Sequence, residues 1–291
     1  MGPSTPAWST DNISMNGSYY TESLHCVTMY KIINILTVII AMVGLAGNAI
    51  VLRIQAFHMQ ENEFSAYILN LAGADFLYLC FQAMYALKHI LLLFHNSYFN
   101  IPIFLNNVLI FAYLAGLCMI TAISVEHCLS VLWPISYQCQ CRGHMSSVLC
   151  ALLWVFSLLL SLLSEYGCGL VLIYYDHSFC RTFKFITAAF VLVLSVVSCG
   201  SILVLLMRIF YGSQRIPATR LYVTIALTVL VFLLFGLPFG IKWFLLDWIM
   251  ELHTVFPCNI SAITAFLSCV NSCAKPIIYF LVDSIRPCIF Q

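Results

Sequence analysis

Two charged residues of this chain stand in the middle of long apolar stretches. Asp75 follows the run Leu71–Ala74, and Lys275 precedes the run Pro276–Ile278. A charge inside a membrane is costly and usually marks a functional site. It could belong to an intramembrane hydrolase, a transporter or a receptor. A hydrolase needs a second acid or a Ser/His pair in a facing stretch, and the sequence offers Asp75 no acidic partner within the membrane.

Other polar or helix-kinking residues also fall inside apolar stretches. Glu126, His127 and Cys128 stand together near the inner end of the third stretch, and Asn48 lies in the first. Pro238 lies in the sixth stretch, where it removes a backbone hydrogen bond and kinks the helix. The sequence shows no internal repeat with broken helices in two symmetric halves, which disfavours a transporter.

Seven apolar stretches carry these residues, and each is long enough to cross a bilayer, which takes about 20 residues of helix. The chain is 63% hydrophobic and only 8% charged, against about 25% charge in a soluble domain. Backbone groups in lipid must be satisfied within the structure, so the stretches must be helices. We therefore predict an all-α fold, a seven-transmembrane helix bundle. The stretches are Ile32–Ile54, Ala66–Leu92, Ile103–Leu132, Val148–Val171, Phe185–Met207, Leu221–Trp248 and Cys258–Val282.

Glycosylation acceptors indicate the orientation of the bundle. Asn12, Asn16 and Asn259 each begin an Asn-X-Ser sequon, and all three lie on the glycosylated, extracellular side if the N-terminus is extracellular. Lys and Arg show a weak excess on the opposite, inner side. We therefore expect a multi-pass plasma-membrane protein with its N-terminus outside.

Three segments are expected along the chain. Residues 1–30 form an extracellular segment, residues 31–282 the seven-helix domain, and residues 283–291 a short cytoplasmic tail with at most a vestigial amphipathic helix. The first 25 residues lack the apolar core of a cleaved signal peptide, so the first span is expected to direct insertion. The formal net charge of +1 gives no reason to expect a nucleic-acid partner. The sequence points to no cofactor and no metal.

Most of the 14 cysteines lie inside the apolar stretches, where a cysteine behaves as a small buried hydrophobe. Cys26, Cys168, Cys180 and Cys258 differ, because they are expected on the outer side, in an oxidising compartment. These four are the candidates for disulfides.

Five longer runs resemble the Mas-related branch of the rhodopsin-like G-protein-coupled receptors. They are Gly47–Leu52, Phe64–Leu77, Cys128–Ile135, Leu233–Leu245, which has Gly at 236, and Pro276–Phe280. The resemblance covers essentially the whole chain. It implies a rhodopsin-like bundle that binds an extracellular peptide or small molecule in a shallow pocket and activates heterotrimeric G proteins of the Gq type, with calcium signalling, in sensory or immune cells. It does not imply an enzyme.

The resemblance also assigns roles to single residues. It implies a disulfide between Cys168 and Cys180, and Cys26 with Cys258 is a second expected pair. The residues expected to switch the receptor or couple it to the G protein are Asn48, Asp75, Glu126, His127, Cys128, Pro238, Lys275, Pro276 and Tyr279.

The expected ligand site departs from that of relatives that sense cations. They carry an acid late in the fourth helix and another early in the fifth, where this chain has Glu165 and Lys184. We therefore expect a weak response to polycations. The less favoured alternative is an anionic or steroidal ligand. The expected ligand-binding residues are Lys88, Glu165, Arg181, Lys184, Trp243 and Asp247.

Two further departures concern signalling. His127 replaces an arginine that normally reaches the G protein, and histidine is shorter and mostly neutral at pH 7. Lys275 replaces an asparagine that faces Asp75 across a hydrated pocket able to hold sodium. We expect Lys275 to form an ion pair with Asp75 in its place. A receptor-like protein that signals poorly therefore stays open as an alternative, with a transporter less favoured.

Overall fold

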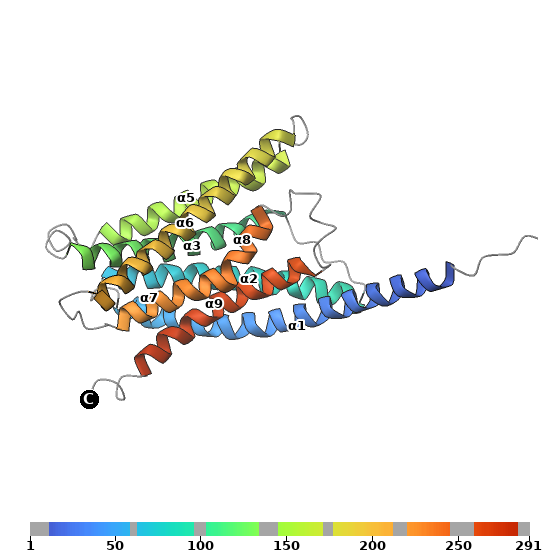
Figure 1. Ribbon diagram of the computed structural model, residues 1–291, viewed down its shortest axis with the longest axis horizontal. Coiled ribbons are helices and arrows are strands. Elements are labelled where there is room, and N and C mark those ends of the chain that lie inside the picture. The colour runs from blue at the N-terminus through green and yellow to red at the C-terminus, as the bar shows by residue number, and fades with distance from the viewer. Residues whose placement is uncertain are drawn as a thin grey trace, which may run out of the picture.

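The computed structural model describes residues 12–58, 63–95, 103–133, 145–170, 177–211, 220–244 and 259–284. All of them except Trp133 and Asn259 are helical, which confirms the all-α prediction (Figure 1). The elements are α1 (Asn12–His58), α2 (Glu63–His95), α3 (Ile103–Leu132), α5 (Met145–Leu170), α6 (His177–Tyr211), α7 (Arg220–Val231), η2 (Phe232–Gly236), α8 (Leu237–Phe244) and α9 (Ile260–Ser284).

Seven spans within these residues are long and apolar enough to cross a membrane, as predicted. The sixth is made of α7, η2 and α8 in succession. The expected tail helix after the seventh span lies outside the described residues. The spans are His25–Ala56, Ser65–Phe94, Leu105–Leu132, Met145–Ser164, Thr182–Met207, Val223–Phe244 and Ile260–Val282.

Helix α3 runs through the middle of the bundle. In Figure 1, α5 and α6 lie on one side of it and α1, α2 and α9 on the other. Of the 18 most apolar consecutive residues of α3, 78% are buried, whereas the corresponding share is 22% in α5 and in α6. The outer faces of the surrounding helices expose large apolar side chains such as Leu152 and Val196. A membrane is the solvent that suits these faces, because apolar surface of this extent is rare on soluble proteins.

Helix α1 begins much earlier than the apolar pattern predicts. It starts at Asn12, whereas the predicted span starts at Ile32. Hydropathy marks where a helix can enter lipid, and it does not mark where the helix begins. The polar residues 12–24, between the start of the helix and the apolar span, contain no proline to stop it. The N-terminal end of α1 therefore runs past the ends of the other helices (Figure 1).

Two glycines bring α1 close to its neighbours. A Cβ atom on Gly44 would lie 2.7 Å from Leu79 Cδ1 and 3.1 Å from Cys273 Cβ. On Gly47 it would lie 3.1 Å from Pro276 Cβ. Small residues allow helices in membranes to approach closely. Asn48, on the same stretch, donates a hydrogen bond to the Ser272 carbonyl at 3.1 Å, so α1 and α9 are also joined by a polar contact.

The sixth span contains a short π-helix directly before Pro238. In η2, the Leu237 N–H donates to the Phe232 carbonyl, one residue further back than in an α-helix. The kink expected at Pro238 stays a prediction, and the structure shows the irregular turn directly before that proline. π-Helical turns are frequent at functional sites.

Candidate functional site

The two membrane charges meet between α2 and α9. Lys275 Nζ lies 2.8 Å from Asp75 Oδ1, and the two side chains are only 2% and 5% exposed. Ser272 Oγ donates to the same oxygen at 2.8 Å. The predicted ion pair is therefore confirmed. It allows both charges to be buried, because either charge alone would leave an uncompensated ion in a low-dielectric interior.

A polar cavity adjoins this pair. Its volume is about 10 Å³, about the minimum that holds one water molecule. Asp75 Oδ2 and Asn271 Oδ1 accept no hydrogen bond within the described part of the chain. Their residues line the cavity, together with Tyr78, Tyr113 and Phe232. Lys275 thus supplies the positive charge of this site, and the remaining space suits one small polar molecule.

A larger cavity lies at the end of the bundle where α1 enters the membrane. Its volume is about 230 Å³. Polar and aromatic side chains line it, and the described lining includes no carboxylate. The lining residues are Tyr30, Asn34, Thr37, Gln82, Tyr85, Ala86, His89, Asn106, Leu109, Phe239, Lys242, Trp243, Ser261, Ala262 and Ala265. We call it the outer cavity.

Aromatic rings connect the outer cavity to the polar core. Phe239 stacks on Trp243 at a centroid distance of 6.0 Å and contacts Tyr113 at 5.2 Å and Tyr78 at 5.7 Å. The Tyr113 hydroxyl donates to the Gly236 carbonyl at 3.2 Å. Since Tyr78 and Tyr113 also line the cavity beside Asp75, these rings form one contiguous set of contacts.

Gly236 permits this arrangement. A Cβ atom there would lie 2.7 Å from Phe232 Cδ2 and 3.0 Å from Asn271 Nδ2. Any larger residue must push Phe232 or Asn271 away. The absence of a side chain therefore lets η2 pack closely against α9.

At the end of the bundle opposite the outer cavity, α2 and α3 are joined by a hydrogen bond from the Tyr67 hydroxyl to Glu126 Oε1. His127 is buried, with 4% of its surface exposed, and so is Cys128. Trp154 of α5 donates to Asn70 Oδ1 of α2 at 2.8 Å, which fastens the fourth span to the same region. The N-terminal half of α2 is therefore bonded to both α3 and α5.

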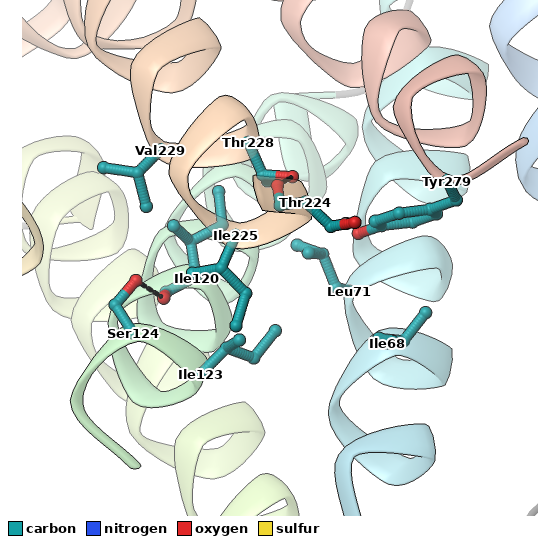
Figure 2. Close-up of a pocket in the computed structure, with 10 residues that line it drawn as sticks. All are labelled: Ile68, Leu71, Ile120, Ile123, Ser124, Thr224, Ile225, Thr228, Val229 and Tyr279. Carbon is teal, nitrogen blue, oxygen red and sulfur yellow. Dashed lines mark hydrogen bonds between the residues drawn. The ribbon is translucent and has the colours of Figure 1, made fainter. Parts of the chain in front are cut away.

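A small apolar cavity of about 20 Å³ lies nearby (Figure 2). Side chains of α2, α3, α7 and α9 line it, among them Leu71, Ile120, Ile225 and Tyr279. Figure 2 shows the Tyr279 ring between α2 and α7, with its hydroxyl directed toward the α7 threonines. In this conformation α7 packs closely enough to leave little space between the helices.

Comparisons with known proteins identify this seven-helix arrangement. Residues 47–279 match the family described as "7 transmembrane receptor (rhodopsin family)". The chain is 59% identical over 286 residues to the mouse Mas-related G-protein coupled receptor member B4, covering 98% of this chain and 88% of that protein. The rat B4 protein is 56% identical (98% and 86% covered), and member X2 of Rhinopithecus bieti is 52% identical (98% and 87% covered).

This chain belongs to the Mas-related G-protein-coupled receptors. It is a multi-pass membrane receptor.

Of the three expected ligand-binding residues whose side chains the structure describes, Trp243 lines the outer cavity of the receptor. Lys184 Nζ lies 5.9 Å from the Trp243 ring centre, so it stands next to the cavity. Lys88 is half-buried and does not line it. The side chains of Glu165, Arg181 and Asp247 lie outside the described residues.

Sequence reasoning missed the α2 side of this cavity. Gln82, Tyr85, Ala86 and His89 all line it. They are spaced three and four residues apart, so they share one face of the helix. Polar residues at this spacing inside an apolar span were the feature of the sequence that could have predicted this side of the cavity.

The cysteines and sequons of the receptor are described only in part. Cys26 is disulfide-bonded, and its partner lies outside the described residues. The side chains of Cys168, Cys180 and Cys258 also lie outside, so both pairings remain predictions. Asn259 is buried at the start of α9, which disfavours a glycan there. The side chains of Asn12 and Asn16 are not among those described.

Proposed function

We propose that this receptor binds a small extracellular ligand in the outer cavity and activates heterotrimeric G proteins of the Gq type. It would do so at the plasma membrane of a sensory or immune cell. The name of each relative reported above includes "G-protein coupled receptor", which supports the G-protein partner. Gq, calcium and the cell type rest on the resemblance of the sequence runs alone.

The proposed orientation places the outer cavity outside the cell. Cys26 is disulfide-bonded and lies one helical turn from Tyr30, a lining residue. Disulfides persist in oxidising compartments and are rare in the cytosol. The disulfide and the sequons at Asn12 and Asn16 thus favour the same side.

The observation that carries the proposal is the set of contacts from Trp243 through Phe239 and Tyr113 to Gly236. A ligand that contacts Trp243 or Phe239 acts directly on the segment beside the π-helical turn. A ligand shifts an equilibrium only if it binds one conformation better than the other. In our proposal the favoured conformation breaks the Tyr113–Gly236 bond, and α7 moves away from α3 and α2 to admit the G protein.

Nucleotide exchange tests this mechanism without a known ligand. Receptor in nanodiscs is mixed with purified Gq, Gi or Gs, and GTP uptake is followed. Tyr113→Phe removes only the hydroxyl that bonds to Gly236, so it should raise basal exchange on Gq severalfold. Ser201→Ala is the control, because that exposed hydroxyl bonds only within its own helix, to the Val197 carbonyl. Equal basal exchange in Tyr113→Phe and wild type would refute the mechanism.

A receptor-like protein that signals poorly is the second candidate. His127 is buried, and Lys275 closes the polar core with its own charge. If this candidate is correct, wild type will be silent on all three G proteins, while His127→Arg combined with Lys275→Asn will activate at least one. Robust exchange by wild type would exclude it.

A further inference from the structure

We infer that the outer cavity selects a small uncharged amide whose N–H and C=O lie on one edge, as in a primary carboxamide or a lactam. The group that recognises this edge is the side-chain amide of Gln82. The inference rests on the proposed function only in taking the outer cavity as the ligand site.

Three neutral polar side chains form the part of the cavity wall that matters here. Asn34 and Thr37 lie three residues apart on one face of α1, and Gln82 lies on α2. All three line the outer cavity, and they are 6%, 3% and 7% exposed. We call them the amide wall. A ligand group that reaches the amide wall therefore leaves most of its water behind.

The α1 side of the amide wall favours a ligand that donates hydrogen bonds. Thr37 Oγ1 donates to the Ile33 carbonyl at 2.8 Å, and Asn34 Nδ2 donates to the Tyr30 carbonyl at 2.8 Å. A hydroxyl has one proton, so Thr37 can only accept from a further partner. The backbone of α1 thus takes up donors of this wall, and acceptors remain for a ligand.

Gln82 supplies the decisive acceptor. Its Oε1 is buried and accepts no hydrogen bond within the described residues. A buried acceptor without a partner is costly, so a ligand that donates to it gains affinity. The terminal torsion of glutamine is broad, so the amide group can turn this oxygen toward the cavity that Gln82 lines.

The form of the amide group decides which ligands can use Gln82 fully. The side chain ends in a C=O acceptor and an NH2 donor on one carbon, so a partner with N–H and C=O on the same edge makes two hydrogen bonds with it. A primary carboxamide and a lactam have such an edge. An open-chain secondary amide is trans, and its N–H and C=O point in opposite directions. It can therefore make only one of the two bonds.

The neutrality of the amide wall favours an uncharged ligand group. A charge that enters a buried site must exchange its water for other partners, and neutral amides and hydroxyls replace that hydration only in part. An uncharged amide gives up less hydration and recovers it through the two bonds with Gln82. The cavity volume of about 230 Å³ leaves room for a small ring system that bears the amide.

Four benzene derivatives separate these features. Benzamide and isoindolin-1-one present N–H and C=O on one edge, N-methylbenzamide presents them on opposite sides, and N,N-dimethylbenzamide has no N–H. Binding to purified receptor in nanodiscs is measured by saturation-transfer NMR, without any G protein. We expect benzamide and isoindolin-1-one to bind about tenfold more tightly than N,N-dimethylbenzamide, with N-methylbenzamide between them. Benzylamine, a cation, and benzoate, an anion, should bind more weakly than benzamide.

Substitutions at Gln82 locate the site. Gln82→Met keeps the length of the side chain and removes the amide, so it should weaken benzamide about tenfold and leave N,N-dimethylbenzamide unchanged. Gln82→Glu replaces the donor with a second acceptor, so it should reverse the preference between benzamide and benzylamine. Ser201→Ala is the control, because its exposed hydroxyl bonds to the Val197 carbonyl of its own helix, and it should change no affinity.

A melting experiment tests the unpaired oxygen separately. Gln82→Met removes a buried acceptor that has no partner, so its melting temperature should equal or exceed that of wild type. A melting temperature several degrees lower would mean that Gln82 is bonded inside the protein, and it would overturn the inference.

Three binding results would also overturn the inference. One is binding of N,N-dimethylbenzamide as tight as that of benzamide, another is an unchanged affinity for benzamide in Gln82→Met, and the third is no binding of benzamide up to millimolar concentration. The G-protein measurement is separate. A receptor that binds benzamide but is silent on all three G proteins would contradict the proposed function and leave the amide site standing. Exchange on Gq by a receptor that binds none of the amides would do the opposite.

Discussion

At the scale of single residues, the Asp75–Lys275 pair gives this receptor a polar core with its own internal counter-ion. The ammonium is covalently held by α9, whereas a diffusible cation would come and go with its concentration. Because Asn48 and Ser272 bond in the same region, α1, α2 and α9 all depend on this small set of contacts.

Removing one charge should be worse than removing both. Asp75→Asn strands the ammonium and Lys275→Met strands the carboxylate, and each should cost about 3–5 kcal/mol of unfolding free energy. The double variant Asp75→Asn with Lys275→Met leaves no buried ion and should regain most of that loss. The melting of wild type, the two single variants and the double variant, purified in detergent and followed by tryptophan fluorescence, completes a double-mutant cycle. Additive losses in the double variant would show that the two charges do not compensate each other.

Lys275→Asn should turn the core into a site that responds to sodium. The variant leaves the Asp75 carboxylate beside Asn271 Oδ1 and the small polar cavity, which is a set of oxygen ligands for a monovalent cation. Its melting temperature should be higher in sodium chloride than in N-methylglucamine chloride at equal ionic strength. Wild type should melt at the same temperature in both salts. A sodium effect of equal size in wild type would contradict the prediction that the Lys275 ammonium takes the place of a sodium ion beside Asp75.

The resemblance, which places Lys275 opposite Asp75, and the cost of burying either charge alone were together enough to predict the ion pair. They were not enough to locate the ligand cavity. Lys184 and Trp243 stand near each other as expected, but the volume opens toward α1, α2 and α9. Which side of a bundle opens depends on how the helices tilt and pack, and a single sequence does not contain that directly.

At the scale of helices, the contact of α1 with α2 and α9 depends on a missing side chain. Gly44→Ala would place a methyl group 3.2 Å from the backbone Cα of Cys273, and 2.7 Å from Leu79 Cδ1. The Leu79 methyl can rotate away, but the α9 backbone must shift. We expect the free energy of unfolding to fall by about 1–3 kcal/mol, which is typical of overpacking.

Gly200→Ala provides the matched control in α6. A Cβ atom there meets nothing within 4 Å. The change should leave stability unaltered or raise it by about 0.5–1 kcal/mol, because alanine loses less backbone entropy in a helix than glycine. Both variants are melted under the same conditions. Equal melting temperatures for the two variants would mean that α1 is not closely packed.

The helices themselves follow from the sequence more readily than their limits do. An apolar stretch of more than 20 residues has only helix open to it in lipid, so all seven spans are where the stretches predict them. The start of α1 at Asn12 and the π-turn at Phe232–Gly236 are different. The first is set by continuation of a helix through polar residues. The second lies where Phe232 and the Tyr113 hydroxyl contact Gly236, a combination of contacts that the sequence does not reveal.

At the scale of the whole molecule, orientation is the property that most constrains function. An epitope tag after Gln291 should be detected only in permeabilised cells, and a tag before Met1 should be detected in intact ones. Asn12→Gln with Asn16→Gln should lower the apparent mass to that of the glycosidase-treated protein. The expectation follows from the sequons and from the disulfide at Cys26. Staining of the C-terminal tag in intact cells would reverse the topology and place the outer cavity in the cytosol.

The chain distance between the two charges of the core also affects how the protein is made. Asp75 and Lys275 are separated by 200 residues. A ribosome adds about 5–20 residues per second, so roughly 10–40 s pass between the synthesis of Asp75 and that of Lys275. During that interval α2 carries a charge that the bilayer disfavours. The final helix supplies the counter-charge, so a nascent chain that stops before α9 keeps an uncompensated carboxylate by which cellular quality control can distinguish it from a finished receptor.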